Sequence, residues 1–150
     1  MAMVIRAELF QPGLQIVQPE FFNQMTTNHG LIMVFGVIMP AFVGLANWML
    51  PMQIGAPDMA LPRLNNLSFW LLPMAFGILI STLFMPEGGP NFGWTFYAPL
   101  STTYAPSTVN FFIFSVHIMG VSSILGSINI ITTIFNMRAP GMTLMKMPLF

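Results

Sequence analysis

Three long apolar runs, separated by short polar segments, dominate the chain. No charged residue occurs between Glu20 and Asp58, between Arg63 and Glu87, or between Glu87 and Arg138. A helix rises about 1.5 Å per residue, so roughly 20 apolar residues cross a hydrocarbon core about 30 Å thick. The pattern therefore predicts three membrane-spanning helices, over about residues 29–54, 67–86 and 108–137.

The positions of proline and glycine indicate that these helices pack together. Pro40 and Pro73 lie inside predicted spans, where membrane helices tolerate proline if neighbouring helices satisfy the freed backbone groups. The loop 86–107 is rich in glycine, proline and aromatic residues, which is typical of a packed lid. The first nine residues are too few to span a membrane, and we interpret them as the end of a further helix.

Composition supports a membrane protein. The chain is 55% hydrophobic and 5% charged, whereas a soluble domain carries about 25% charged residues. This excludes a soluble enzyme and makes the lipid bilayer a partner. A net charge of zero argues against nucleic-acid binding, which needs clustered basic residues. The absence of cysteine excludes disulfides and thiolate metal sites.

The loop charges predict an orientation. Three spans place the loop of Arg63 on the same side as the segment that carries Arg138 and Lys146. Three of the four basic residues then share a face, which the positive-inside rule makes cytoplasmic. The other face receives the remaining charged residues outside the Asp58 loop, namely Arg6, Glu8, Glu20 and Glu87.

Polar residues inside the spans are candidates for function, because polar groups are costly in hydrocarbon. His29 and Asn47 are separated by five helical turns and share a predicted face with Gly36. His29 is either a hydrogen-bonded structural residue or a metal ligand, since neutral imidazole is the commonest protein ligand for metals. His117 lies off the polar stripe of its helix, which favours a structural role.

The last span carries a polar stripe at nearly helical spacing, formed by Ser115, Ser122, Asn129 and Thr133. Such a stripe is either a set of hydrogen bonds between helices or one wall of a water or proton path. Asp58 lies just beyond a span, where a carboxylate is solvated, paired with a base, or collects protons.

Several stretches together resemble one family. In order along the chain they are IRAEL (5–9), QPG (11–13), HGLIM (29–33), NW (47–48), GAPDMALPRLNNLSFWLLP (55–73), GWTFYAPLS (93–101), FSVHIMGVSSILGSIN (114–129) and RAPGMTLMKMPLF (138–150). The chain resembles the first part of subunit I of cytochrome c oxidase, of the heme–copper oxidase superfamily. The 55–73 stretch is the most specific of these motifs.

The resemblance implies an all-α, polytopic transmembrane helix bundle. The chain would supply the end of helix one and helices two to four of a twelve-helix fold. The implied reaction is the reduction of dioxygen to water with electrons from cytochrome c, coupled to proton pumping. The implied partners are the rest of subunit I, oxidase subunits II and III, and cytochrome c. The implied location is the bacterial plasma membrane, with the mitochondrial inner membrane as the alternative.

The resemblance also implies heme contacts. His29 matches the axial ligand of the heme a iron, and Gly36 would leave room for the macrocycle. Arg6 matches the arginine that hydrogen-bonds the heme a formyl group. Trp94 and Tyr97 match aromatic residues beside the heme propionates.

A peripheral cation site is implied at the same face. Glu8 and Gly13 match positions of a sodium or calcium site, formed by a carboxylate and a backbone oxygen. Phe10 replaces a small residue of the family in that turn, which is a departure from the pattern.

A proton pathway is implied at the cytoplasmic face. Asp58 resembles its mouth, and Asn47 and Asn65 match the asparagines just above it. Ser122 and Ser123 match serines higher in the path. His117 matches a histidine that binds no metal and that favours the cytochrome c branch, as does the pair Pro62–Arg63.

The family's copper ligands and high-spin heme ligand have no counterpart in these 150 residues, which contain two histidines. We therefore expect a fragment with no catalytic residue of its own, inactive in isolation, with copper and the high-spin heme held only by the full subunit. Three alternatives stay open, namely an inactive remnant, a small helical membrane protein, and a proton channel without redox chemistry.

Overall fold

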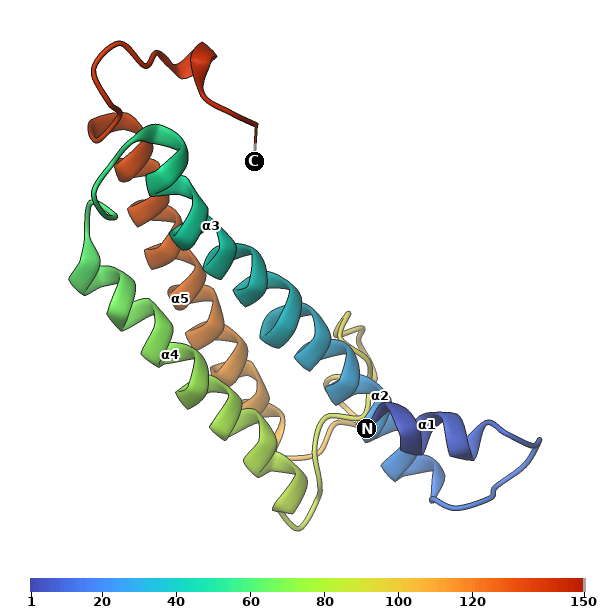
Figure 1. The fold of residues 1–150 in the computed structure, drawn as a ribbon. Coiled ribbons are helices and arrows are strands. Elements are labelled where there is room, and N and C mark those ends of the chain that lie inside the picture. The colour runs from blue at the N-terminus through green and yellow to red at the C-terminus, as the bar shows by residue number, and fades with distance from the viewer. Residues whose placement is uncertain (150) are drawn as a thin grey trace.

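The computed structural model describes residues 1–149, and over that range it is helical with no strand (Figure 1). The α-helices are α1 (Ala2–Glu8), α2 (Pro19–Leu31), α3 (Met39–Ile54), α4 (Pro62–Ser81) and α5 (Val109–Asn136). The shorter elements are the π-helix η1 (Ile32–Ile38) and the 3₁₀-helices η2 (Thr82–Phe84) and η3 (Leu144–Lys146). The predicted all-α helix bundle is confirmed.

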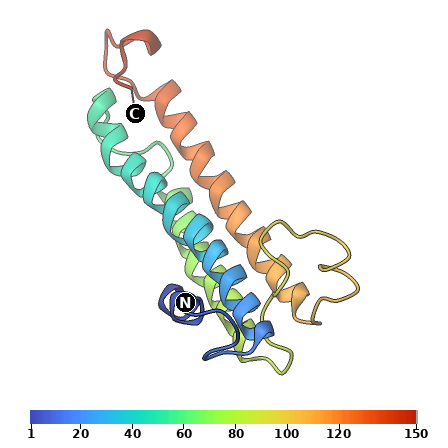
Figure 2. The same cartoon turned by 90° about the vertical axis from the view of Figure 1, so that its right-hand side faces the viewer.

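Three continuous helical segments are long and apolar enough to cross a membrane: Pro19–Ile54, Pro62–Phe84 and Val109–Asn136. The loop after α3 and the segment after α5 lie at the same end of the bundle (Figure 1), where the Ala139 amide donates to the Ile54 carbonyl at 2.9 Å. Helix α1 and the loop 85–108 lie at the opposite end (Figure 2). The arrangement agrees with the predicted sharing of one face by Arg63, Arg138 and Lys146.

The first long helix begins ten residues before His29, earlier than the hydropathy pattern indicates. Pro19 occupies the first turn, where its fixed φ suits a helix and its missing N–H costs nothing. The turns that follow contain the buried polar residues Gln24, Thr27 and Asn28. Hydropathy misses these turns because their side chains are buried against a loop rather than against lipid.

A π-helical segment interrupts the first long helix between His29 and Asn47. The Met39 amide bonds the Val34 carbonyl, five residues back. Pro40 follows directly; it has no N–H, and in an α-helix its ring would crowd the Gly36 carbonyl. The predicted face shared by His29 and Asn47 assumed 3.6 residues per turn throughout, so that expectation does not hold.

Helices α4 and α5 form the most closely packed pair. The Ser115 hydroxyl donates to the Ala75 carbonyl at 2.7 Å, and the Ser122 hydroxyl donates to the Ser68 carbonyl at 2.6 Å. Two residues of the polar stripe therefore form hydrogen bonds between helices, which is the first of the two roles considered for the stripe. Apolar side chains complete the main core, namely Leu31, Ala75, Leu79, Phe92, Phe112, Ile118 and Met119.

Gly36 makes room for a neighbouring helix within this chain. A Cβ added at Gly36 would lie 2.6 Å from Cζ of Phe76, on α4. The expectation that Gly36 leaves space for a macrocycle is therefore wrong, because the Phe76 ring fills that space.

Candidate functional site

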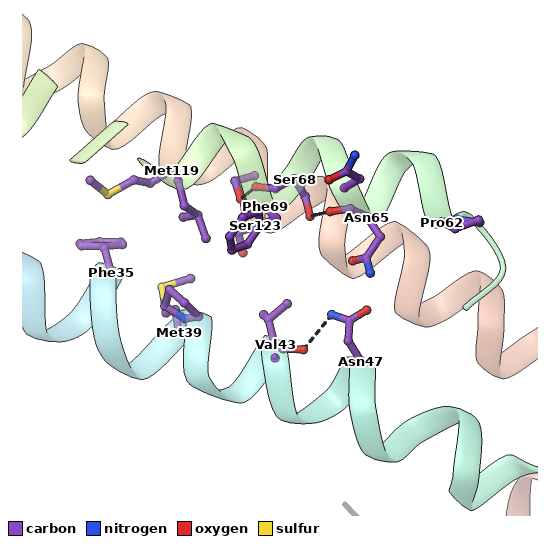
Figure 3. Close-up of a pocket in the computed structure, with 15 residues that line it drawn as sticks. Phe35, Met39, Val43, Asn47, Pro62, Asn65, Ser68, Phe69, Met119 and Ser123 are labelled. Carbon is purple, nitrogen blue, oxygen red and sulfur yellow. Dashed lines mark hydrogen bonds between the residues drawn. The ribbon is translucent and has the colours of Figure 1, made fainter. Parts of the chain in front are cut away.

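A cavity of about 520 Å³ lies between η1 and α3 on one side and α4 and α5 on the other (Figure 3). Four residues of the predicted proton pathway line it: Asn47, Asn65, Ser122 and Ser123. They come from three different helices and are up to 76 residues apart in sequence (123 − 47). The remaining wall is mostly apolar and includes Phe35, Met39, Phe69, Leu72 and Met119.

The polar groups of this cavity leave hydrogen-bonding capacity unused. The Asn47 side-chain amide donates to the Val43 carbonyl at 2.8 Å, but its Oδ1 is buried without a partner within residues 1–149. Asn47 and Asn65 point toward one another across the cavity (Figure 3). Buried acceptors without a protein partner are satisfied by ordered water where several polar groups line the space, and Asn65, Ser122 and Ser123 also line this cavity.

Asp58 lies outside the cavity, near its end. It is exposed in the loop between α3 and α4, and its Oδ1 accepts a hydrogen bond from the Met59 amide at 2.7 Å. Pro62, four residues further on, lines the cavity. The structure thus brings the four other pathway residues together and puts Asp58 at the solvent side of the same end.

Two residues of α5 hold the Asp58 loop in place. Asn129 Oδ1 accepts from the Leu61 amide at 2.8 Å, and Thr133 Oγ1 accepts from the Ala60 amide at 2.9 Å. Both side chains are fully buried. Sequence reasoning placed them on the polar stripe but missed this role, because spacing shows which face they occupy and not which loop covers it.

His29 is half-buried near the end of α2, and within residues 1–149 its ring has no hydrogen-bond partner. The ring of His117 differs, because its Nδ1 lies 2.8 Å from the Ile113 carbonyl of its own helix. Next to His29, a Cβ added at Gly30 would meet nothing within 4 Å. A half-buried imidazole that makes no hydrogen bond to residues 1–149 fits one axial ligand of a heme iron.

The other predicted heme contacts lie at the same end of the bundle. Arg6 is exposed on α1, which lies beside α2 (Figures 1 and 2). Trp94 and Tyr97 are exposed on the loop 85–108, with 58% and 72% of their surface accessible. Within residues 1–149 no group of three or more His, Cys, Asp or Glu side chains gathers for a metal ion.

Glu8 closes a turn with its carboxylate. The two oxygens accept hydrogen bonds from the amides of Gln15 at 2.9 Å, Ile16 at 2.7 Å and Val17 at 3.0 Å. These bonds, that of Gln15 above all, lower the pKa of Glu8 below its usual 4.5. Gly13 lies in the same turn with φ of 94°. The peripheral sodium or calcium site at Glu8 and Gly13 stays a prediction, and the carboxylate that it would use already accepts these three amide bonds.

Comparison with known proteins places these features in a family. A family model described as Cytochrome C and Quinol oxidase polypeptide I matches residues 1–150. The probable cytochrome c oxidase subunit 1-alpha of Streptomyces coelicolor is 47% identical over 152 residues, which cover 100% of this chain and 26% of that protein.

Two further relatives give the same result. Cytochrome c oxidase subunit 1 of Cereibacter sphaeroides is 51% identical over 134 residues, covering 86% of this chain and 24% of that protein. The subunit 1 of Corynebacterium diphtheriae is 46% identical over 152 residues, covering 100% and 27%. The chain therefore spans about a quarter of the length of these curated relatives.

Proposed function

The chain belongs to the cytochrome c and quinol oxidase polypeptide I family, and from this premise we propose that it forms part of subunit I of a terminal respiratory oxidase. The whole subunit would reduce dioxygen to water with electrons from cytochrome c and couple this reaction to proton movement. The observation that carries the proposal is the single cavity that gathers Asn47, Asn65, Ser122 and Ser123 from three helices.

We propose that His29 is the axial ligand of a low-spin heme a, with Arg6 as donor to its formyl group. When bound, the heme supplies one-electron transfer. The half-buried imidazole of His29 makes no hydrogen bond to residues 1–149, which supports this role. Trp94 and Tyr97 would donate from the indole N–H and phenol O–H to the propionates, and both side chains are exposed.

The proton pathway is proposed to begin at Asp58. Its exposed carboxylate collects protons from the cytoplasmic side, and water in the cavity carries them between Asn47 and Asn65 toward Ser122 and Ser123. The unpaired Asn47 Oδ1 supports a water at that point. The Ser122 hydroxyl donates to Ser68, so it faces the path as an acceptor.

The assembled protein is proposed to lie in the bacterial plasma membrane with the rest of subunit I and with subunits II and III. Helix α3 supports this assembly, because it exposes large apolar side chains, including Phe42, Trp48 and Met52. The family also carries a high-spin heme and copper, which we assign to parts of the subunit outside this chain.

The heme proposal is tested by His29→Ala, with His117→Ala as the matched control, in membranes that contain the assembled complex. We expect His29→Ala to lose the low-spin heme absorption, whereas His117→Ala retains it. Retention of the full low-spin signal without His29 would remove the assignment. Complete absence of heme from the unchanged protein would favour a remnant without redox chemistry.

The proton proposal is tested by Asp58→Asn, with Glu20→Gln as a control that removes a carboxylate from the opposite end. We expect Asp58→Asn to slow proton uptake during turnover while Glu20→Gln does not. Equal uptake by both variants would contradict the proposal. Proton conductance by membranes free of heme would instead favour a channel.

A further inference from the structure

The loop 85–108 is fastened at its base. The Ser107 amide donates to the Glu87 carboxylate, and the Thr108 hydroxyl donates to the Gly88 carbonyl at 2.7 Å. These bonds join the start of the loop to the residues just before α5. The loop therefore leaves the bundle and returns to it at one point.

The loop is also bonded to α2 at the turn before His29. The Gly93 amide donates to Thr27 Oγ1 at 3.1 Å, while the Thr27 hydroxyl donates to the Asn23 carbonyl at 2.8 Å. Both capacities of this hydroxyl are used, one by its own helix and one by the loop. Thr27 is 4% exposed, so water does not compete easily for the bond.

Two glycines bring the loop backbone against the same helix face. A Cβ added at Gly89 would lie 3.0 Å from Nδ2 of Asn28, and one added at Gly88 would overlap the side-chain amide of Gln24. Gly88 also has φ of 71°, which favours glycine. Gln24 and Asn28 are one helical turn apart and buried. The contact thus has a fixed position along α2.

The outer part of the loop is held from within by aromatic packing. Phe96 stacks on Phe112 of α5, with ring centroids 4.9 Å apart, and meets Phe92 edge to face at 4.7 Å. Phe96 has φ of 62°, a strained value for this residue that persists only where surroundings determine it. Trp94 and Tyr97 on the same loop are exposed.

We infer that Thr27 and the Gly88–Gly89 turn are positioning residues that fix His29 relative to Trp94 and Tyr97. The inference rests on the proposed heme function of these three side chains. Successive residues of an α-helix are turned by about 100°, so His29 points roughly 200° away from Thr27. Holding Thr27 and Asn28 against the loop therefore sets the direction of the imidazole on the other side of α2.

The helical repeat changes close to His29, because the π-helix η1 begins three residues after it. Short π segments inside α-helices frequently lie at functional sites. The contact of the loop with Gln24 and Asn28 fixes α2 on the N-terminal side of His29. It also links two sets of heme-facing residues that the chain separates by more than 60 positions (94 − 29 = 65).

The test compares Thr27→Val with Thr26→Val in the assembled membrane complex. Both threonines bond a carbonyl of their own helix, but the Thr26 hydroxyl meets only the Phe22 carbonyl. We expect Thr27→Val to speed hydrogen exchange in a peptide covering residues 88–97 by about three- to tenfold, the effect of one lost hydrogen bond. We also expect it to shift the low-spin heme absorption maximum at unchanged heme content. Thr26→Val changes neither, and Thr27→Ser restores both.

A second variant, Gly89→Ala, tests the same contact if Thr27→Val fails to assemble. Its added methyl group crowds the Asn28 side chain, with Cβ 3.0 Å from Nδ2, so it should shift the absorption maximum in the same way. If Thr27→Val and Gly89→Ala match Thr26→Val in exchange and in spectrum, the inference is wrong. The proposed function is contradicted by a different result, namely retention of the low-spin heme in His29→Ala. In that case the hydrogen exchange of residues 88–97 still shows whether Thr27 holds the loop against α2.

Discussion

At the scale of single residues, the carboxylates of Glu8 and Glu87 accept hydrogen bonds from backbone amides. Glu8 accepts from three amides of its own turn. Glu87 accepts from the Ser107 amide, and this bond is the main reason why its pKa lies below the usual 4.5. Amide donors stabilise the ionised carboxylate, so both contacts depend on its charge.

The lowered pKa of Glu87 predicts a pH dependence for the base of the loop 85–108. The contribution of the ionised carboxylate is complete above pH 4.5 and is lost as pH falls through the lowered folded value. Hydrogen exchange of residues 104–110, corrected for the intrinsic rate, should therefore accelerate only in acid. Glu87→Gln should show faster exchange already at neutral pH, while Glu8→Gln, whose carboxylate bonds a different turn, should leave the exchange of residues 104–110 unchanged. A pH-independent profile would contradict the prediction.

At the scale of elements, the π-helix η1 and α4 meet where glycine and phenylalanine fit together. Gly36 accepts the ring of Phe76, and the same long helix carries Gly44, where an added Cβ would meet nothing within 4 Å. The two glycines therefore differ in packing although both lie in apolar sequence.

Gly36→Ala should lower the free energy of unfolding by about 1–3 kcal/mol, because the new methyl group overpacks the contact with Phe76. Gly44→Ala should be neutral or stabilising by up to about 1 kcal/mol, since alanine favours helix over glycine. Unfolding by sodium dodecyl sulfate in mixed micelles measures both. Equal effects would show that Phe76 does not set the requirement for glycine.

The polar stripe of α5 has a structural task at the end of the helix that holds the Asp58 loop. Thr133→Val leaves the Ala60 amide unpaired and should cost about 1–3 kcal/mol, and it should loosen the Asp58 loop. Thr132→Val is the control, because the Thr132 hydroxyl bonds only the Ile128 carbonyl of its own helix. The same unfolding titration, with proton uptake as the second readout, checks this. A Thr133 variant as stable as the Thr132 variant would refute the role.

At the scale of the whole molecule, the helices form an open group rather than a closed bundle. Helices α4 and α5 pack closely, while the long first helix stands off and leaves the cavity between them. Large side chains on the outer faces, among them Trp70, Phe114 and Phe135, are more than half exposed. In a membrane these faces meet lipid or other helices.

The 150 residues expressed alone in membranes should therefore show no reduction of dioxygen in an oxygen-electrode assay. With two histidines and no cysteine, they offer too few nitrogen and sulfur ligands for a heme and copper centre. The same residues within a complete subunit should support turnover. Turnover by the 150 residues alone would contradict the division of ligands proposed here.

The sequence by itself determined the membrane class, the three long helices, which loops share an end of the bundle, and the family. These features depend on hydropathy, on the number of spans and on the order of the motifs. It could not predict the start of α2, because the buried polar residues of its first turns have the low hydropathy that is typical of loops. Nor could it predict the π segment, since spacing arguments assume one helical repeat. Only the tertiary structure decided that Gly36 receives Phe76, that Asn129 and Thr133 hold the Asp58 loop, and that Thr27 meets Gly93. Each of these contacts joins residues far apart in the chain, and a pattern read along one helix shows a face but not the neighbour that covers it.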